Sequence, residues 1–138
     1  MSDRFPHPYT LEIARAWVAR GHIDFGGDNF AIAFDDVAVG GAGIIQGEGQ
    51  FRCNVEIGYW LGEPFWGRGV TTDVARTLTA LAFALPGVTR VFAGIHADNP
   101  ASMRALQKNG FEREGVLRKS AMKDGTAIDR VLWAKIRA

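Results

Sequence analysis

Apolar and polar positions along this chain alternate first with the period of strands and then with that of helices. Two apolar, β-rich runs cover residues 30–34 and 39–45, and Asp35-Asp36 between them predicts a hairpin. A third strand-like run covers residues 53–61. Side chains alternate between the two faces of a strand, so the pattern places Asn54, Glu56, Gly58 and Trp60 on one face and Cys53, Val55 and Ile57 on the other.

Helical spacing marks three further segments. Residues 10–20 read as a helix capped by Thr10. A glycine-rich loop precedes a second helix that ends at Pro86-Gly87. Its apolar face comprises Val74, Leu78, Leu81 and Leu85. A third, short helix has Asn99 as N-cap, Pro100 in its first position and Asn109-Gly110 at its end.

The remaining strands complete one α/β domain over residues 1–138. Residues 90–95 follow the second helix, which predicts a parallel crossover from the strand at 53–61. Residues 111–117 and 127–136 predict a closing antiparallel pair joined across residues 123–126. We therefore expect a mixed sheet with helices on both faces.

Composition narrows the class of protein. The 138 residues are 47% hydrophobic and carry a formal net charge of +1, which gives no electrostatic reason to expect nucleic acid or a membrane as partner. There is no apolar run long enough to span a bilayer and no signal-peptide pattern, so we predict a cytoplasmic protein. Cys53 is the single cysteine, and we predict that it is a small core residue and that no metal is bound.

The segment from Glu56 to Thr72 carries the strongest chemical signal. A strand, a glycine-rich loop and a helix N-terminus follow one another there, and this order suits a phosphate. The P-loop pattern is absent, and the dinucleotide fingerprint fails at Thr72, where its third glycine belongs. The sequence thus predicts a short loop that binds one pyrophosphate.

Two motifs together resemble a known family. The strand Glu-Ile-Gly-Tyr-Trp-Leu with its loop Trp-Gly-Arg-Gly-Val-Thr-Thr, and the later Asn-Pro-Ala-Ser and Lys-Asn-Gly-Phe, are similar to the GNAT superfamily of N-acetyltransferases. The branch that acetylates the N-termini of ribosomal proteins resembles the chain more closely. The resemblance implies a central, mostly antiparallel sheet with a splayed parallel pair, flanked by helices. It also implies transfer of an acetyl group from acetyl-CoA to a primary amine.

The resemblance also implies where acetyl-CoA binds. Pantetheine would pair with the third strand, pyrophosphate would meet the loop and helix start, and Asn99 would contact the pantetheine. The implied cofactor-binding residues are Tyr59, Trp60, Leu61, Trp66, Gly67, Arg68, Gly69, Val70, Thr71, Thr72, Asn99 and Ser102. Trp66 and Thr71 depart from the superfamily pattern, and Thr71 adds a branched side chain where close approach is wanted.

Acetyl transfer needs a neutral amine, although lysine-like amines have a pKa near 10.4. Glu56 is the candidate base, with Asp98 and Glu63 as competitors and a solvated edge carboxylate as its non-catalytic reading. Ser102 is the candidate proton donor to the thiolate, although capping alone also explains both Asn99 and Ser102. Because we place no tyrosine near the Asn99 helix, water is the alternative donor.

Relatives of this type usually carry a strand and a helix before the segment that resembles residues 9–17, and this chain begins almost at that segment. We therefore expect an open acceptor groove, a homodimer in which a partner covers it, or a natural fragment, and a homodimer is our prediction. A non-catalytic acyl-CoA-binding module or a dimeric interaction domain is the alternative function. The acceptor amine, whether a protein N-terminus or a small amine, stays open.

Overall fold

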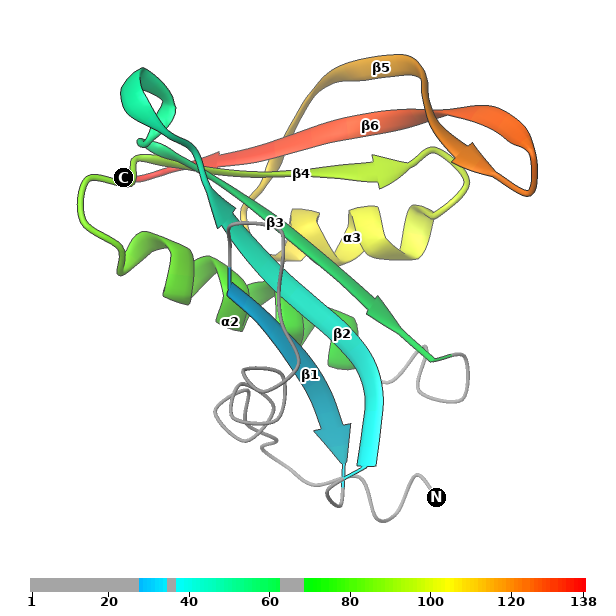
Figure 1. Cartoon of the computed structure of the whole chain (residues 1–138), viewed down its shortest axis with the longest axis horizontal. Coiled ribbons are helices and arrows are strands. Elements are labelled where there is room, and N and C mark those ends of the chain that lie inside the picture. Colours follow the sequence, from blue (N-terminus) through cyan, green and yellow to red (C-terminus); the bar gives the residue numbers. More distant parts are fainter. Residues whose placement is uncertain (1–27, 35–36, 63–68) are drawn as a thin grey trace.

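The computed structural model describes residues 28–34, 37–62 and 69–138. Six strands form one sheet in the order β1-β2-β3-β4-β6-β5 (Figure 1). The strands are β1 (Asp28–Phe34), β2 (Val37–Gln46), β3 (Asn54–Leu61), β4 (Arg90–His96), β5 (Glu112–Lys123) and β6 (Thr126–Ile136). Every neighbouring pair is antiparallel except β3 and β4, which are parallel as predicted.

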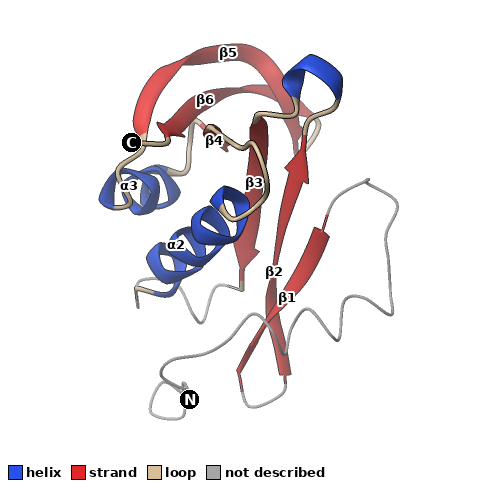
Figure 2. Cartoon of the chain, turned by 90° about the vertical axis from the view of Figure 1, so that its left-hand side faces the viewer, coloured by secondary structure: helices blue, strands red, loops and turns tan. Residues whose placement is uncertain are grey.

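Helix α2 (Val70–Phe83) connects β3 to β4, and α3 (Pro100–Lys108) connects β4 to the edge strand β5. A short 3-10 turn, η2 (Gly49–Phe51), precedes β3. The two helices contact each other and share one face of the sheet (Figure 2). We expected helices on both faces. The helix predicted for residues 10–20 lies outside the described residues. Among the described residues no α-helix lies on the face opposite α2 and α3, and that face is called the open face below.

The core lies between the sheet and the two helices. Val55 and Ile57 of β3, Val74 and Leu78 of α2, and Leu106 of α3 are all at most 1% exposed. On β3 the other alternate residues face away from this core, because Glu56 is half-buried and Trp60 is 66% exposed. The face assignment made for this strand is therefore confirmed.

The sheet opens between β3 and β4. Their parallel register covers three pairs and ends at Glu56 and Phe92, although β3 continues to Leu61 and β4 to His96. Beyond that pair the two strands run apart (Figure 1), and β4 keeps its antiparallel pairing with β6. The splayed parallel pair that the family resemblance implied is present.

Some boundaries and one burial differ from the predictions. Helix α2 ends at Phe83, before Pro86, since Ala84 already serves as the C-cap. Strand β5 continues past Leu117 to Lys123 through an irregularity between Leu117 and Ala121. Cys53, predicted to be a core residue, is only partly buried because it lies in the turn before β3.

Candidate active site

The splay between β3 and β4 is bordered by Glu56 and by β3 up to Leu61, and Ser102 lies beside Tyr59. Trp66, Gly67, Arg68 and Glu63 lie outside the described residues. The helix-covered face holds Tyr59, Leu61, the start of α2 and the start of α3. The open face holds Glu56 and the side chain of Trp60.

The N-terminus of α2 is the described part of the predicted phosphate site. Gly69 is its N-cap in the left-handed region, with φ 75°, and no side chain caps the helix. A Cβ at Gly69 would have no neighbour within 4 Å among the described residues. The N-terminal turn of a helix presents backbone amides and the positive end of its dipole, and Thr71 and Thr72 lie in this turn.

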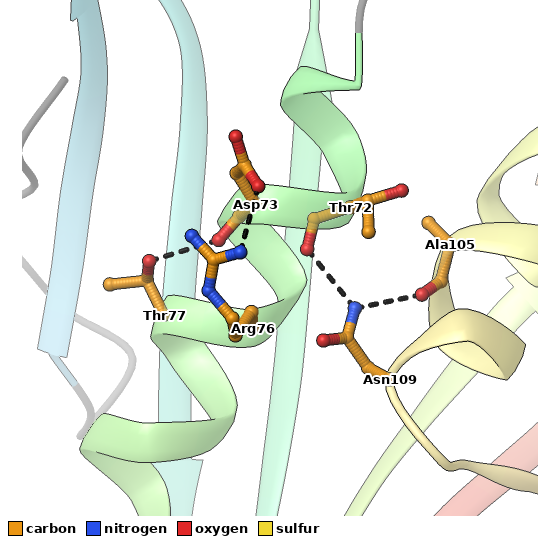
Figure 3. A network of polar contacts seen from close by, with 6 residues as sticks. All are labelled: Thr72, Asp73, Arg76, Thr77, Ala105 and Asn109. Atoms are coloured by element: carbon orange, nitrogen blue, oxygen red, sulfur yellow. Dashed lines mark hydrogen bonds and ion pairs between the residues drawn. The ribbon is translucent and has the colours of Figure 1, made fainter. Parts of the chain in front are cut away.

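One acidic side chain lies in the first turn of α2. Asp73 accepts a hydrogen bond from Arg76 at 2.9 Å, and the two form an ion pair (Figure 3). The guanidinium offsets the charge of the carboxylate that is nearest in sequence to the predicted phosphate position. The positive end of the helix dipole is therefore less offset by this carboxylate, which favours an anionic ligand there.

Asn109 fixes this turn from the end of α3. Its Nδ2 donates to the carbonyl of Thr72 at 3.0 Å and to the carbonyl of Ala105 at 2.8 Å (Figure 3). Lys135 donates to the backbone carbonyl of Asn109 at 2.9 Å. Sequence reasoning assigned Asn109-Gly110 to the helix end, and Gly110 has φ 86° as such an end requires. It missed that the same asparagine joins α3 to the first turn of α2.

The start of α3 follows the capping prediction. Asn99 is the N-cap, and its Oδ1 accepts a hydrogen bond from the Ser102 amide at 3.2 Å. Pro100 occupies the first helical position. The side chain of Ser102 is left available, and the residue is buried, with 7% exposed. Capping thus accounts for the oxygen of Asn99 and not for the hydroxyl of Ser102.

A tyrosine does reach this helix, which corrects the sequence prediction. Tyr59 lies on the helix-covered face of β3, and its hydroxyl is buried beside Ser102 without a hydrogen bond of good geometry in the described part of the chain. Burial raises the pKa of Tyr59 above its ordinary value, and the Ser102 hydroxyl offsets part of that increase. The sequence does not reveal that the two residues are close, because Tyr59 belongs to β3 and Ser102 to α3.

Glu56 lies where the splay begins. It is the last β3 residue in register with β4, opposite Phe92, and it faces the open side. A groove of about 470 Å³ runs along this side of β2 and β3, and Glu56, Gly58 and Trp60 contribute to its lining. The Trp60 indole lies across Gly41, where a Cβ would be 2.5 Å from its Nε1. Trp60 therefore offers a ligand in the splay its backbone, while its side chain lines the groove.

Asp98, the competing base, is already engaged. Lys123 Nζ donates to its carboxylate at 2.7 Å, and this contact lowers the pKa of Asp98 below its ordinary value. The side chain of Asp98 is 53% exposed. A carboxylate that is paired and weakly basic is poorly suited to accept a proton from an ammonium group.

A domain model for the acetyltransferase (GNAT) family matches residues 1–112 of this chain. The chain belongs to the GNAT acetyltransferase family. The uncharacterized N-acetyltransferase YoaA of Bacillus subtilis is 34% identical over 88 residues, which are 64% of this chain and 50% of YoaA. The ribosomal-protein-serine acetyltransferase of Escherichia coli is 36% identical over 84 residues, or 59% of this chain and 45% of that protein.

Solved GNAT structures share the fold. Mycobacterium smegmatis RimJ in complex with CoA-disulfide superposes with a TM-score of 0.73 at 27% identity, covering 89% of this chain and 57% of RimJ. The chain spans about half the length of these curated relatives. In the described residues no helix is long and apolar enough to cross a membrane.

Proposed function

We propose that this GNAT domain transfers the acetyl group of acetyl-CoA to a primary amine by direct attack on the thioester. The splay between β3 and β4 carries the proposal, because it opens at Glu56 and gives both faces of the sheet access to one position. Acetyl-CoA supplies the activated acetyl group, and the acceptor amine approaches from the open face. Assembly as a homodimer and a cytoplasmic location stay predictions.

The described residues fit acetyl-CoA at three points. The edge of β3 beyond Glu56 has no register with β4, so an extended pantetheine arm can add there as a strand would. The turn at Gly69, Thr71 and Thr72, where no described side chain caps the helix, suits the pyrophosphate, together with Trp66, Gly67 and Arg68 as the family resemblance implies. A buried hydroxyl without a good partner, that of Tyr59, lies beside the splay.

Glu56 is the proposed base. Its carboxylate accepts a proton from the acceptor ammonium, directly or through one water, and the neutral nitrogen then forms a bond to the thioester carbon as the carbon–sulfur bond breaks. The nitrogen loses its second proton as the amide forms, and the departing thiolate takes up one proton, so the transfer releases one proton overall. In the part of the chain that the structure describes, Glu56 has no ion pair. Asp98 is a weaker candidate because Lys123 lowers its pKa.

Ser102 and Tyr59 are the proposed donors to the departing thiolate. The two hydroxyls lie side by side on the helix-covered face. A coenzyme thiolate has a basicity near that of a cysteine thiolate, whose pKa is about 8.5, so one hydroxyl donor is enough to protonate or hold it. The neutral form of Tyr59 is favoured by its burial, which keeps the proton on the hydroxyl until it is needed.

The decisive experiment measures thiol release from acetyl-CoA across a panel of amines. Glu56→Gln should lower kcat by about 100-fold or more, since general base catalysis supplies about 10² to 10⁴ in rate. The matched variant Asp98→Asn removes an exposed carboxylate and should leave kcat within twofold. A thermal shift with acetyl-CoA should be the same for both variants and the parent.

The outcomes also separate the alternative functions. Binding of acetyl-CoA without turnover of any amine, or an unchanged rate in Glu56→Gln, indicates a non-catalytic acyl-CoA-binding module. No thermal shift with acetyl-CoA indicates an interaction domain. A large loss of activity in Asp98→Asn would move the base to that residue.

A further inference from the structure

Arg130 lies on the open face close to the splay. It is in register with His96 of β4 and Leu117 of β5, and it is half-buried. A Cβ at Gly94 would be 2.9 Å from its Nη1, 3.6 Å from its Cζ and 3.7 Å from its Cδ. The guanidinium therefore lies across the bare backbone of Gly94, where a side chain would obstruct it.

The irregular part of β5 orients this side chain. Arg130 Nε donates to Ser120 Oγ at 3.0 Å, and that hydroxyl donates to the Leu117 carbonyl at 2.7 Å. Lys119 has a φ of 52° and donates its amide to Asp129 Oδ1 at 2.9 Å. A positive φ is unfavourable for a lysine, so these contacts hold a costly backbone shape that places Ser120 against Arg130.

The charge of Arg130 has no partner within the described residues. No described ion pair includes Arg130, and its Nη groups have no acceptor there. Arg130 lines a groove of about 790 Å³ with Arg118, Lys119 and Asp129. The Asp129 carboxylate accepts from the Lys119 amide, and the three cations outnumber it. An oriented guanidinium in such a groove suits the two oxygens of a carboxylate.

The position of Gly94 relates this site to the proposed base. Gly94 follows Phe92 by two residues on the same face, and Phe92 is in register with Glu56. Spacings of about 3.3 Å per residue along a strand and about 4.8 Å between strands put the two backbone positions roughly 8 Å apart. Glu56 and the guanidinium that lies over Gly94 therefore belong to nearby positions on one face, which suits an acceptor whose amine and carboxylate are a few bonds apart.

We propose that the acceptor carries a carboxylate a few bonds from its amine and that Arg130 binds this carboxylate while Glu56 takes the proton from the amine. This inference rests on the proposed function. Two sources share the chemistry, namely a free amino acid and a peptide whose first residue is acidic. Arg130 would thus determine acceptor specificity without taking part in bond making.

The test uses matched acceptors with the full chain. Glycine is compared with glycinamide, and an amidated peptide beginning with Asp is compared with one beginning with Asn. In whichever of the two pairs the parent protein acetylates the acidic member, Arg130→Gln should lower kcat/KM at least tenfold for that acidic acceptor and less than twofold for its amide. Because the amines of a pair differ in basicity, each acceptor is compared between parent and variant. Arg113→Gln removes an exposed arginine of the same hairpin and should change neither.

Binding gives a readout that does not need turnover. CoA-saturated protein should bind N-acetylglycine or the acetylated Asp peptide at least tenfold more tightly than the amide counterpart, and Arg130→Gln should abolish the difference. Equal binding of acid and amide by the parent overturns the inference, as does an equal loss for both in the variant. Turnover of neutral amines alone also overturns it and leaves the proposed function intact. Failure of all turnover refutes the proposed function, while the binding comparison still decides the role of Arg130.

Discussion

Replacing Tyr59 by phenylalanine should stabilise the ligand-free protein. The hydroxyl oxygen of Tyr59 is buried and lacks a hydrogen bond of good geometry among the described residues, while its ring packs against the core cluster. An unsatisfied buried polar group costs about 1–3 kcal/mol, and phenylalanine removes the group but keeps the ring. Because the nearby Ser102 hydroxyl offsets part of this cost, we expect a gain of about 1 kcal/mol in the free energy of unfolding.

Urea unfolding and a thermal scan measure this gain. For a domain of this size a change of 1 kcal/mol shifts Tm by about 3–5 °C, so Tyr59→Phe should melt a few degrees higher than the parent. Ser102→Ala and the double variant complete a mutant cycle. The coupling between the two hydroxyls should stay below about 0.5 kcal/mol without ligand, since no well-formed hydrogen bond joins them.

The difference in stability between Tyr59→Phe and the parent should also change with pH in the alkaline range. Burial raises the pKa of Tyr59 above the ordinary value of 10.0, so the unfolded chain loses this proton at a lower pH than the folded chain. The folded state binds more protons in that window, and its stability therefore falls as pH rises from about 10 toward the raised pKa. Phenylalanine has no such proton, and the advantage of Tyr59→Phe should widen above pH 10.

A free energy of unfolding that is lower in Tyr59→Phe than in the parent by about 1 kcal/mol or more would contradict the predicted stabilisation, because that loss is typical of a satisfied hydrogen bond. A difference that stays constant through pH 10 and above would also contradict the inferred burial of the hydroxyl. With acetyl-CoA present, the stability advantage of Tyr59→Phe over the parent should shrink. If the ligand engages the Tyr59 hydroxyl, its thermal shift should be smaller in Tyr59→Phe than in the parent.

Three further variants test the supports of the site. Gly69→Ala should cost about 1–2 kcal/mol in urea unfolding, because alanine is strained at a φ of 75° even though its Cβ meets no described atom; a fall in acetyl-CoA affinity should accompany it. Asn109→Leu should cost about 1–3 kcal/mol by removing the donor to Thr72, and should weaken acetyl-CoA binding more than it lowers kcat. Asp98→Asn should change Tm only slightly because its pair with Lys123 is exposed. The pair stabilises above the ordinary pKa of the carboxyl and is lost as pH falls through its lowered pKa, so any difference from the parent should vanish in acid.

Local signals account for the parts of the fold that the sequence predicted. The faces of β3 follow from strict alternation, and both ends of α3 follow from Asn99, Pro100 and Gly110. These features depend on residues that are neighbours in the chain. The path of β5 was not predicted, because the irregularity after Leu117 depends on a different strand. It is stabilised by groups on β6, including Asp129 and Arg130.

Contacts between distant segments account for the parts of the site that were missed. The amide of Asn109 reaches Thr72, 37 residues earlier, and no local pattern marks either residue for this contact. Tyr59 was assigned to the cofactor by its place in β3, yet its nearness to Ser102 depends on how α3 packs beneath the splay. Arg130 has no motif of its own, and its position follows from the register of β6 with β4 and from the glycine at residue 94.

The separation of the two sheet faces makes the proposed roles independently testable. Tyr59, Ser102 and the turn that Asn109 supports lie on the helix-covered face, whereas Glu56 and Arg130 lie on the open face. The faces communicate where β3 and β4 part, beyond Glu56 and Phe92. Variants of the turn that Asn109 supports should therefore change the affinity for acetyl-CoA, and variants of the proposed donors Tyr59 and Ser102 should change that affinity or the rate. Variants of Glu56 and Arg130 should change the rate or the choice of acceptor and leave that affinity unchanged. If Arg130→Gln weakens acetyl-CoA binding as much as Asn109→Leu does, the two faces do not divide the substrates in this way.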